Sequence, residues 1–183
     1  MRVIGLAGWS GAGKTSLIVK LIPALQTEGL SVSTLKRAHH NFDVDQPGKD
    51  SFRHREAGAH EVLIASSHRF ALMHELRDAQ ELSLAELITK LEPVDILIIE
   101  GFKHEAHAKL EVHRATNAKP FLFPDDPNIK ALVSDAPEAG ALFQSHLPYA
   151  HLDDIDAIVE LILKCAAPME ETLRRLSANR QMQ

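Results

Sequence analysis

The sequence predicts an α/β protein in which helices flank a mostly parallel β-sheet and an antiparallel hairpin is added. Three observations lead to this prediction. Near the N-terminus, a glycine-rich loop stands between an apolar run and a stretch with a helical apolar pattern. Residues 96–99 are all aliphatic, which is typical of a strand buried on both faces. Residues 61–66 and 69–74 are strand-like runs joined by a tight turn.

The glycine-rich loop matches the phosphate-binding pattern G-x-x-x-x-G-K-[ST] at every fixed position. Glycine lets the backbone turn its N–H groups toward an anion, and the helix that follows directs its positive dipole end to the same place. Lys14 would reach the β- and γ-phosphates of a nucleotide, and the Thr15 hydroxyl would bind Mg²⁺. We therefore predict a phosphate-loop NTPase-type fold with these nucleotide-binding residues: Gly8, Ser10, Gly11, Ala12, Gly13, Lys14, Thr15 and Ser16.

The elements around this loop follow from their patterns. Residues 3–7 form the first predicted strand, and residues 16–22 belong to a helix that ends at Gly29. Residues 30–35 alternate between the two faces of a second predicted strand. The chain is therefore expected to open with a βαβ unit containing a parallel pair of strands.

A long polar loop, residues 36–51, follows the second strand at the edge of the sheet where α/β proteins bind ligands. We interpret this loop as part of the site, with Asp50 as a Mg²⁺ ligand. The other groups suited to phosphate, a partner or a precursor are Lys36, His39, His40, Asp43, Asp45 and Lys49. The alternative is a solvated surface loop that binds no ligand.

Glu100 directly follows the aliphatic run and so lies at the C-terminal end of a central strand. The second acid of a phosphate-loop protein occupies that end, whereas Asp95 would lie at the opposite edge of the sheet. Glu100 would hold Mg²⁺ through water or orient an attacking water, which makes it the candidate metal ligand and catalytic residue. The alternative is a plain strand followed by a turn at Gly101.

Other patterns place the remaining elements. Residues 51–59 and 83–91 predict helices, the second capped by Ser83. Residues 109–114 alternate as an edge strand does, and residues 129–135 predict a strand that ends at the ligand side.

The C-terminal part predicts a helix over residues 154–164, capped by Asp153. We expect one nucleotide-binding domain over residues 1–167, without a linker signal, followed by a tail over residues 168–183. The tail is expected to be partly helical and frayed from Ser177.

Composition narrows the function classes. The net charge of −5 argues against non-specific nucleic-acid binding, and the single cysteine, Cys165, excludes an intramolecular disulfide. No apolar run approaches the roughly 18 residues that span a membrane, and no signal peptide precedes the first strand. We expect a soluble, cytoplasmic protein that binds neither nucleic acid nor membrane.

These motifs resemble those of the MobB family, the small GTP-binding proteins of molybdopterin guanine dinucleotide biosynthesis, from about Val3 to Lys164. The phosphate loop is shared by very many proteins, so other motifs carry the resemblance. They are the pair His39-His40, the run D-x-D-x-P-G-K-D-S at residues 43–51, and E-G-F-K-H-E at residues 100–105.

The resemblance implies GTP and Mg²⁺ binding, slow hydrolysis at most, and a homodimer. It also implies action with MobA, the guanylyltransferase that attaches the guanosine moiety to molybdopterin, with molybdopterin or a molybdoenzyme as a possible further partner. Guanine preference comes from the family, because the sequence has no N-K-x-D motif. Ser134 and Asp135 lie on the side of the sheet where they would accept hydrogen bonds from guanine.

Two other function classes stay open. An ATP-dependent small-metabolite kinase would also use the loop and the acid, but it needs an arginine-rich lid, and the arginines at 53, 55 and 69 are scattered. A metallochaperone-type GTPase would carry metal on His39 and His40. His104 and His107 are expected to be exposed loop histidines, and Arg114 to be either a phosphate clamp or a surface charge.

Overall fold

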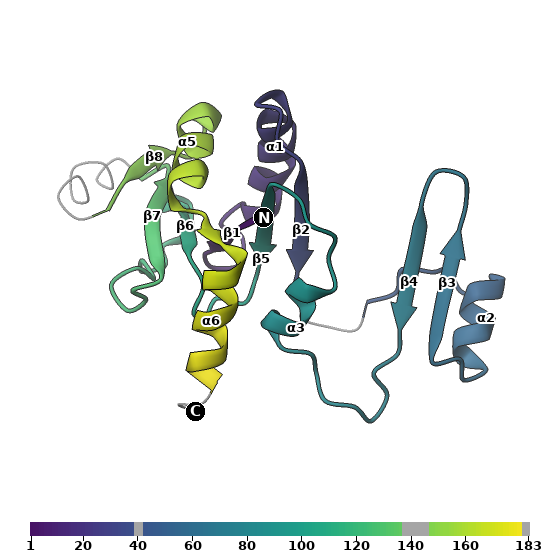
Figure 1. Cartoon of the computed structure of the whole chain (residues 1–183). Coiled ribbons are helices and arrows are strands. Elements are labelled where there is room, and N and C mark those ends of the chain that lie inside the picture. The colour runs from purple at the N-terminus through teal and green to yellow at the C-terminus, as the bar shows by residue number, and fades with distance from the viewer. Residues whose placement is uncertain (39–41, 137–146, 181–183) are drawn as a thin grey trace. The chain divides into compact units, whose positions relative to one another are not determined.

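A computed structural model of the chain describes residues 1–38, 42–136 and 147–180 (Figure 1). By their contacts, these residues divide into two compact units. The first is Met1–Arg37 with Leu84–Gln183, and the second is Ala38–Ser83. This differs from the single domain expected over residues 1–167, because the inserted segment makes its contacts mostly within itself. Among the described residues, no helix combines the length and the apolar character needed to span a membrane.

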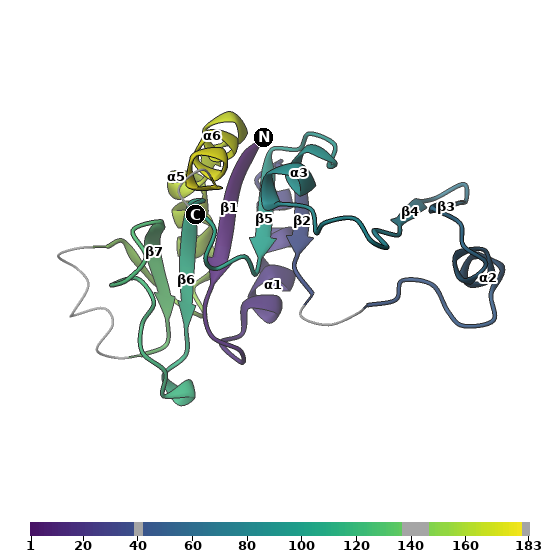
Figure 2. The same cartoon turned by 90° about the horizontal axis from the view of Figure 1, so that it is seen from below.

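The first unit is built on a seven-stranded sheet. Six strands are parallel, in the order β2 (Val32–Lys36), β5 (Ile96–Glu100), β1 (Arg2–Ala7), β6 (Lys109–His113), β7 (Ile129–Ser134) and β8 (Tyr149–His151). Figure 2 shows the first five of them side by side. The short β9 (Ala167–Pro168) pairs antiparallel with the start of β1. The predicted mostly parallel sheet is therefore confirmed.

The two strands of the predicted βαβ unit are not a hydrogen-bonded pair, because β5 lies between β1 and β2. Val3 of β1 and Ser33 of β2 both align with Leu97 of β5. Strand β5 is apolar on both faces and lies inside the sheet, whereas the more polar β2 forms the edge.

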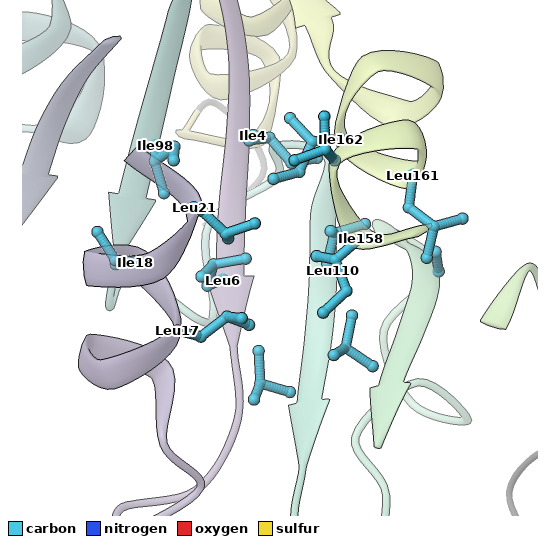
Figure 3. Packing of buried hydrophobic residues seen from close by; sticks show 14 of the residues in the cluster. Ile4, Leu6, Leu17, Ile18, Leu21, Ile98, Leu110, Ile158, Leu161 and Ile162 are labelled. Carbon is cyan, nitrogen blue, oxygen red and sulfur yellow. The ribbon is translucent and has the colours of Figure 1, made fainter. Parts of the chain in front are cut away.

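One face of the sheet is covered by α1 (Lys14–Thr27) and α5 (Ile155–Cys165). Leu17 and Leu21 of α1 and Ile158 of α5 pack against the strands, and Figure 3 shows these side chains gathered over β1 and β6. Helix α5 is capped by Asp154, whose side chain accepts from the Ala157 N–H, rather than by the predicted Asp153. This apolar layer is the main core of the unit.

The other face is covered partly by α3 (Leu84–Thr89) and α6 (Met169–Arg180). Leu176 of α6 is buried in one cluster with Val3, Leu97 and Ile88, so the C-terminal tail belongs to the first unit. The expected fraying from Ser177 is wrong as far as Arg180, because the helix continues to that residue. Residues 181–183 lie outside the described residues.

Strand β6 corrects the predicted edge strand over residues 109–114. It lies between β1 and β7, and every one of its residues is buried. The polar side chains of β6 find partners in the loop that follows it: the Lys109 ammonium pairs with Asp126 at 2.6 Å, and both Glu111 oxygens accept backbone N–H groups of that loop. Alternating polarity therefore reflects buried polar pairs here, not a solvated face.

The second unit contains α2 (Asp50–Glu56) and an antiparallel hairpin of β3 (Glu61–Ala65) and β4 (Phe70–His74). The hairpin is confirmed, and it forms a separate two-stranded sheet. The helix predicted over residues 51–59 is observed as α2.

Candidate functional site

The phosphate loop connects β1 to α1, and its backbone depends on glycine. Gly8, Gly11 and Gly13 have φ of 148°, 80° and 90°, values that side chains other than hydrogen rarely allow. A Cβ on Gly8 would lie 2.2 Å from the Val112 carbonyl oxygen. Gly13 is the N-cap of α1, whose first N–H groups have no partners within the helix. The loop therefore presents backbone donors at a helix N-terminus, as anion binding requires.

Lys14 lies folded over this loop. Its Nζ donates to the carbonyl oxygens of Gly8 and Trp9, at 2.8 and 2.9 Å. Burial lowers the pKa of its ammonium from the ordinary 10.5; Glu100 opposes this shift, and Lys103 and Lys36 add to it. A partly buried ammonium at this position favours an anionic ligand, because the anion would compensate for the water that the ammonium has lost.

Glu100 and Thr15 are brought together from β5 and α1. The Thr15 hydroxyl donates to Glu100 Oε1 at 2.7 Å, and Lys36 Nζ lies 3.4 Å from Glu100 Oε2. At the other end of β5, Asp95 accepts hydrogen bonds from Ser31, which lower the pKa of its carboxyl. The end of the strand at which an acid lies thus decides which acid reaches the loop.

A segment after β6 supports the loop from another side, and sequence reasoning missed it. It includes the short helix η1 (Ala115–Asn117). Asn117 Nδ2 donates to the Ser10 carbonyl at 3.2 Å, and Trp9 Nε1 donates to the Pro120 carbonyl at 2.8 Å. These pairs are more than 100 residues apart in the chain, so spacing gives no signal for them.

Cations gather around the same loop. The ammonium groups of Lys103 and Lys119 lie 4.9 and 5.9 Å from the centre of the Trp9 ring. Arg114 follows β6 directly, and its Nη2 lies 3.3 Å from the position a Cβ on Gly13 would take. Although the chain has a net charge of −5, this part of it is basic, which favours an anionic ligand.

The two residues predicted to read guanine have other partners within the protein. The Ser134 side chain is fully buried, and its Oγ lies 3.2 Å from His113 Nδ1 and accepts from the Ala136 N–H. Asp135 Oδ1 accepts from the Ala115 N–H at 2.8 Å, and its Oδ2 lies 3.9 Å from Arg114 Nε. Of the pair, only Asp135 is partly exposed.

The polar loop of the second unit is held by Arg55. Its Nη2 lies 2.8 Å from Asp43 and 3.0 Å from Asp45, and its Nη1 lies 3.6 Å from Glu75. Lys49 and Asp50 stand at the start of α2 in the same unit, whereas Thr15 and Glu100 belong to the first unit, so the assignment of Asp50 as a Mg²⁺ ligand stays a prediction. His39 and His40 lie outside the described residues.

The histidines after Glu100 differ from each other. His104 is exposed as expected. His107 was expected to be an exposed loop histidine, but it is completely buried against Gly5. Burial lowers the His107 pKa from 6.5 to about 4, with help from Lys109. In the described part of the chain, no three His, Cys, Asp or Glu residues are grouped as metal ligands.

Comparison with known proteins gives consistent results. Residues 3–135 match the family model described as MobB, molybdopterin guanine dinucleotide synthesis protein B. The chain is 38% identical, over 167 residues, to the molybdopterin-guanine dinucleotide biosynthesis adapter protein of Escherichia coli, with 88% of this chain and 91% of that protein aligned.

Other matches agree with these. The adapter protein of the same name from Haemophilus influenzae is 41% identical over 120 residues, which cover 64% of this chain and 66% of that one. The crystal structure of Bacillus subtilis MobB superposes with a TM-score of 0.68 at 27% identity, covering 90% of this chain and 97% of that chain.

Proposed function

The chain belongs to the MobB family and is an adapter protein of molybdopterin guanine dinucleotide biosynthesis, and on that premise we propose that it binds GTP and Mg²⁺ for a MobA-like guanylyltransferase. The single observation that carries this proposal is the meeting of Lys14, Thr15 and Glu100 at the start of α1. The phosphates would lie against the loop backbone and the Lys14 ammonium.

The side chains present fit the metal. A hydroxyl and a carboxylate are hard oxygen donors of the kind that Mg²⁺ prefers, and Thr15 and Glu100 are already in contact. Bound Mg²⁺ would neutralise phosphate charge. Glu100 is paired with both Thr15 and Lys36, which suits holding a metal better than accepting a proton from water. We therefore expect GTP hydrolysis to be slow at most.

The proposal is tested by calorimetric titration of the full chain with GTP and with ATP in Mg²⁺. GTP should bind more tightly, and Lys14→Ala should weaken binding by 100-fold or more, roughly the worth of several charge-assisted contacts. Lys20→Ala is the matched control, because Lys20 is exposed on the same helix. Equal affinity for the two nucleotides would refute the guanine part of the proposal.

The adapter role predicts a nucleotide-dependent complex. A MobA-like guanylyltransferase should bind the GTP-loaded chain more tightly than the nucleotide-free chain, because the second ligand selects the loaded state. Surface plasmon resonance can measure these affinities. Molybdopterin or a molybdoenzyme can be tested as a further partner in the same way. If Lys14→Ala in excess GTP binds the partner as tightly as the GTP-loaded wild type does, partner binding does not depend on the nucleotide.

The proposed homodimer finds support in the second unit. Leu63 and Leu72 are opposite each other on the hairpin, Phe70 lies on the same face, and all three are more than half exposed. Leu72→Lys should shift the chain toward monomers in light scattering, whereas Val44→Lys, at another exposed apolar position of the same unit, should not. A wild-type monomer would refute this part.

A further inference from the structure

Arg114 has a place at the phosphate loop that its protein contacts do not account for. It leaves the C-terminal end of β6, the strand beside β1, where ligands of parallel sheets bind. Its Nη2 and Cζ lie 3.3 and 3.8 Å from where a Cβ on Gly13 would be. Since Gly13 immediately precedes α1, the guanidinium lies against the residue at which the helix dipole begins.

The guanidinium is not fully satisfied by the protein. Its Nε is buried and has no hydrogen-bond partner among the residues that the structure describes. The carboxylate of Asp135 lies 3.9 Å from this Nε, close enough for an ion pair but too far for a hydrogen bond. A buried donor without an acceptor is costly, so contacts within the protein do not account for the position of this side chain, which is 42% exposed and therefore accessible to a ligand.

Asp135 fixes the backbone from which Arg114 extends. Its Oδ1 accepts from the N–H of Ala115, the next residue, at 2.8 Å. Its other oxygen faces Arg114 Nε. One carboxylate thus holds both the turn after β6 and the side chain before it, which is the arrangement of a positioning residue.

We propose that Arg114 is a further phosphate-binding residue of the loop and that Asp135 positions it rather than reading the base. The inference rests on the proposed nucleotide binding and assigns the polyphosphate, not guanine, as the chemistry this pair recognises. A planar guanidinium with several donors binds two phosphate oxygens at once, which an ammonium cannot do. Lys14, at the start of α1, and Arg114, directly after β6, then both contact the polyphosphate.

The experiment titrates the full chain with GTP, ATP and inorganic tripolyphosphate, in Mg²⁺. Arg114→Ala should weaken all three by the same factor, roughly 10- to 100-fold for lost charged hydrogen bonds. Arg114→Lys should recover only part of the loss, because lysine keeps the charge but cannot donate two parallel hydrogen bonds to a phosphate. Arg175→Ala is the control and should change nothing, because it removes a positive charge from the exposed side of α6, where Arg175 pairs with Glu171.

Asp135→Asn separates the two roles of Asp135. If it positions Arg114, the variant weakens GTP and ATP equally, and adding it to Arg114→Ala costs little more. If it reads guanine, the GTP-to-ATP preference falls while tripolyphosphate binding stays the same, and the inference is wrong. Tripolyphosphate binding unaffected by Arg114→Ala would likewise overturn it, with stacking on the base as the explanation if GTP alone weakened.

The titrations with the three ligands also separate this inference from the proposed function. Wild-type chain that binds tripolyphosphate but shows no preference for GTP refutes guanine specificity and leaves Arg114 testable. Wild-type chain that binds GTP, with Arg114→Ala unchanged, refutes the inference alone. Wild-type chain that binds none of the three refutes both. Unfolding temperatures of each variant show whether a loss of binding comes from a loss of fold.

Discussion

The two units of the chain differ in how they are stabilised. The first unit buries a broad apolar layer on one face of its sheet and a second cluster on the other. In the second unit, among residues 42–83, Val62 is the only buried hydrophobic side chain, and several large apolar residues of the hairpin are exposed. The well-packed first unit therefore supports the phosphate loop, whereas the second unit offers apolar surface for association.

The largest expected effect comes from glycine, and it differs between the units. Gly8→Ala would require φ near 148° and place a Cβ 2.2 Å from the Val112 carbonyl oxygen, so we expect a loss above about 4 kcal/mol. Gly48→Ala in the second unit meets no atom within 4 Å and should cost only the strain of its positive φ, about 1–2 kcal/mol. Urea unfolding measures both, and similar losses would contradict the comparison.

A cavity in the core of the first unit should have the next largest effect. Leu21 is completely buried between α1 and the sheet, so Leu21→Ala should destabilise the first unit by about 3–4 kcal/mol. Val19→Ala is the control, because Val19 is 66% exposed on the same helix and should change stability by less than about 0.5 kcal/mol. Denaturant unfolding followed by circular dichroism checks both values.

His107 makes the first unit sensitive to acid. Its pKa of about 4 in the folded chain lies below the ordinary 6.5, so the unfolded chain takes up the proton first as the pH falls. Stability should therefore drop between pH 6.5 and 4, by about 3 kcal/mol in total. His107→Leu should remove most of this drop.

Urea unfolding at pH 7 and pH 4.5 measures the effect. His54→Leu, which removes an exposed imidazole from α2, controls for the substitution itself. If wild type and His107→Leu lose stability equally on acidification, His107 is not the group responsible.

The smallest of these effects belongs to the second unit. Val62→Ala removes two buried methyl groups, worth about 1–2 kcal/mol. Since the unit has little other core, we expect faster hydrogen exchange throughout β3 and β4, with β1 and β5 unchanged. Equal or slower exchange in the hairpin would show that Val62 does not stabilise it, and a change that extended to β1 would show that the two units are not independent.

The sequence predicted elements wherever local pattern decides structure. The phosphate loop, the apolar β5 and the β3–β4 hairpin all follow from residue types within a few positions of each other. The position of β5 between β1 and β2 does not, because strand order depends on which strands tolerate burial on both faces. The extent of α6 was also missed, since its packing through Leu176 is a tertiary contact.

Buried polar residues explain the main error. Lys109, Glu111 and His113 alternate with apolar residues, which is the pattern of a strand with a solvated face. Their partners come from the loop after β6: Asp126 for Lys109, two backbone N–H groups for Glu111, and the Lys119 carbonyl oxygen 3.1 Å from His113 Nε2. Periodicity records polarity but not the partner that satisfies it.

In the candidate site too, contacts that follow from local pattern were predicted and long-range contacts were not. Glu100 beside Thr15 follows from the strand end at which each residue lies. The contacts of Trp9, Asn117 and Arg114 join segments about a hundred residues apart, and no spacing rule connects them. The charged loop at residues 43–50 lies in the second unit, where Arg55 pairs with Asp43 and Asp45.

Thr15 and Glu100 make the phosphate loop a magnesium–nucleotide site if the Mg²⁺ dependence of GTP affinity differs between wild type and Glu100→Gln. Glutamine keeps the shape and a hydrogen-bond acceptor for Thr15 but removes the charge that the metal needs. We predict that Mg²⁺ strengthens GTP binding by about tenfold or more in wild type and by less than about twofold in Glu100→Gln. An equal gain from Mg²⁺ in both proteins would show that Glu100 does not hold the metal.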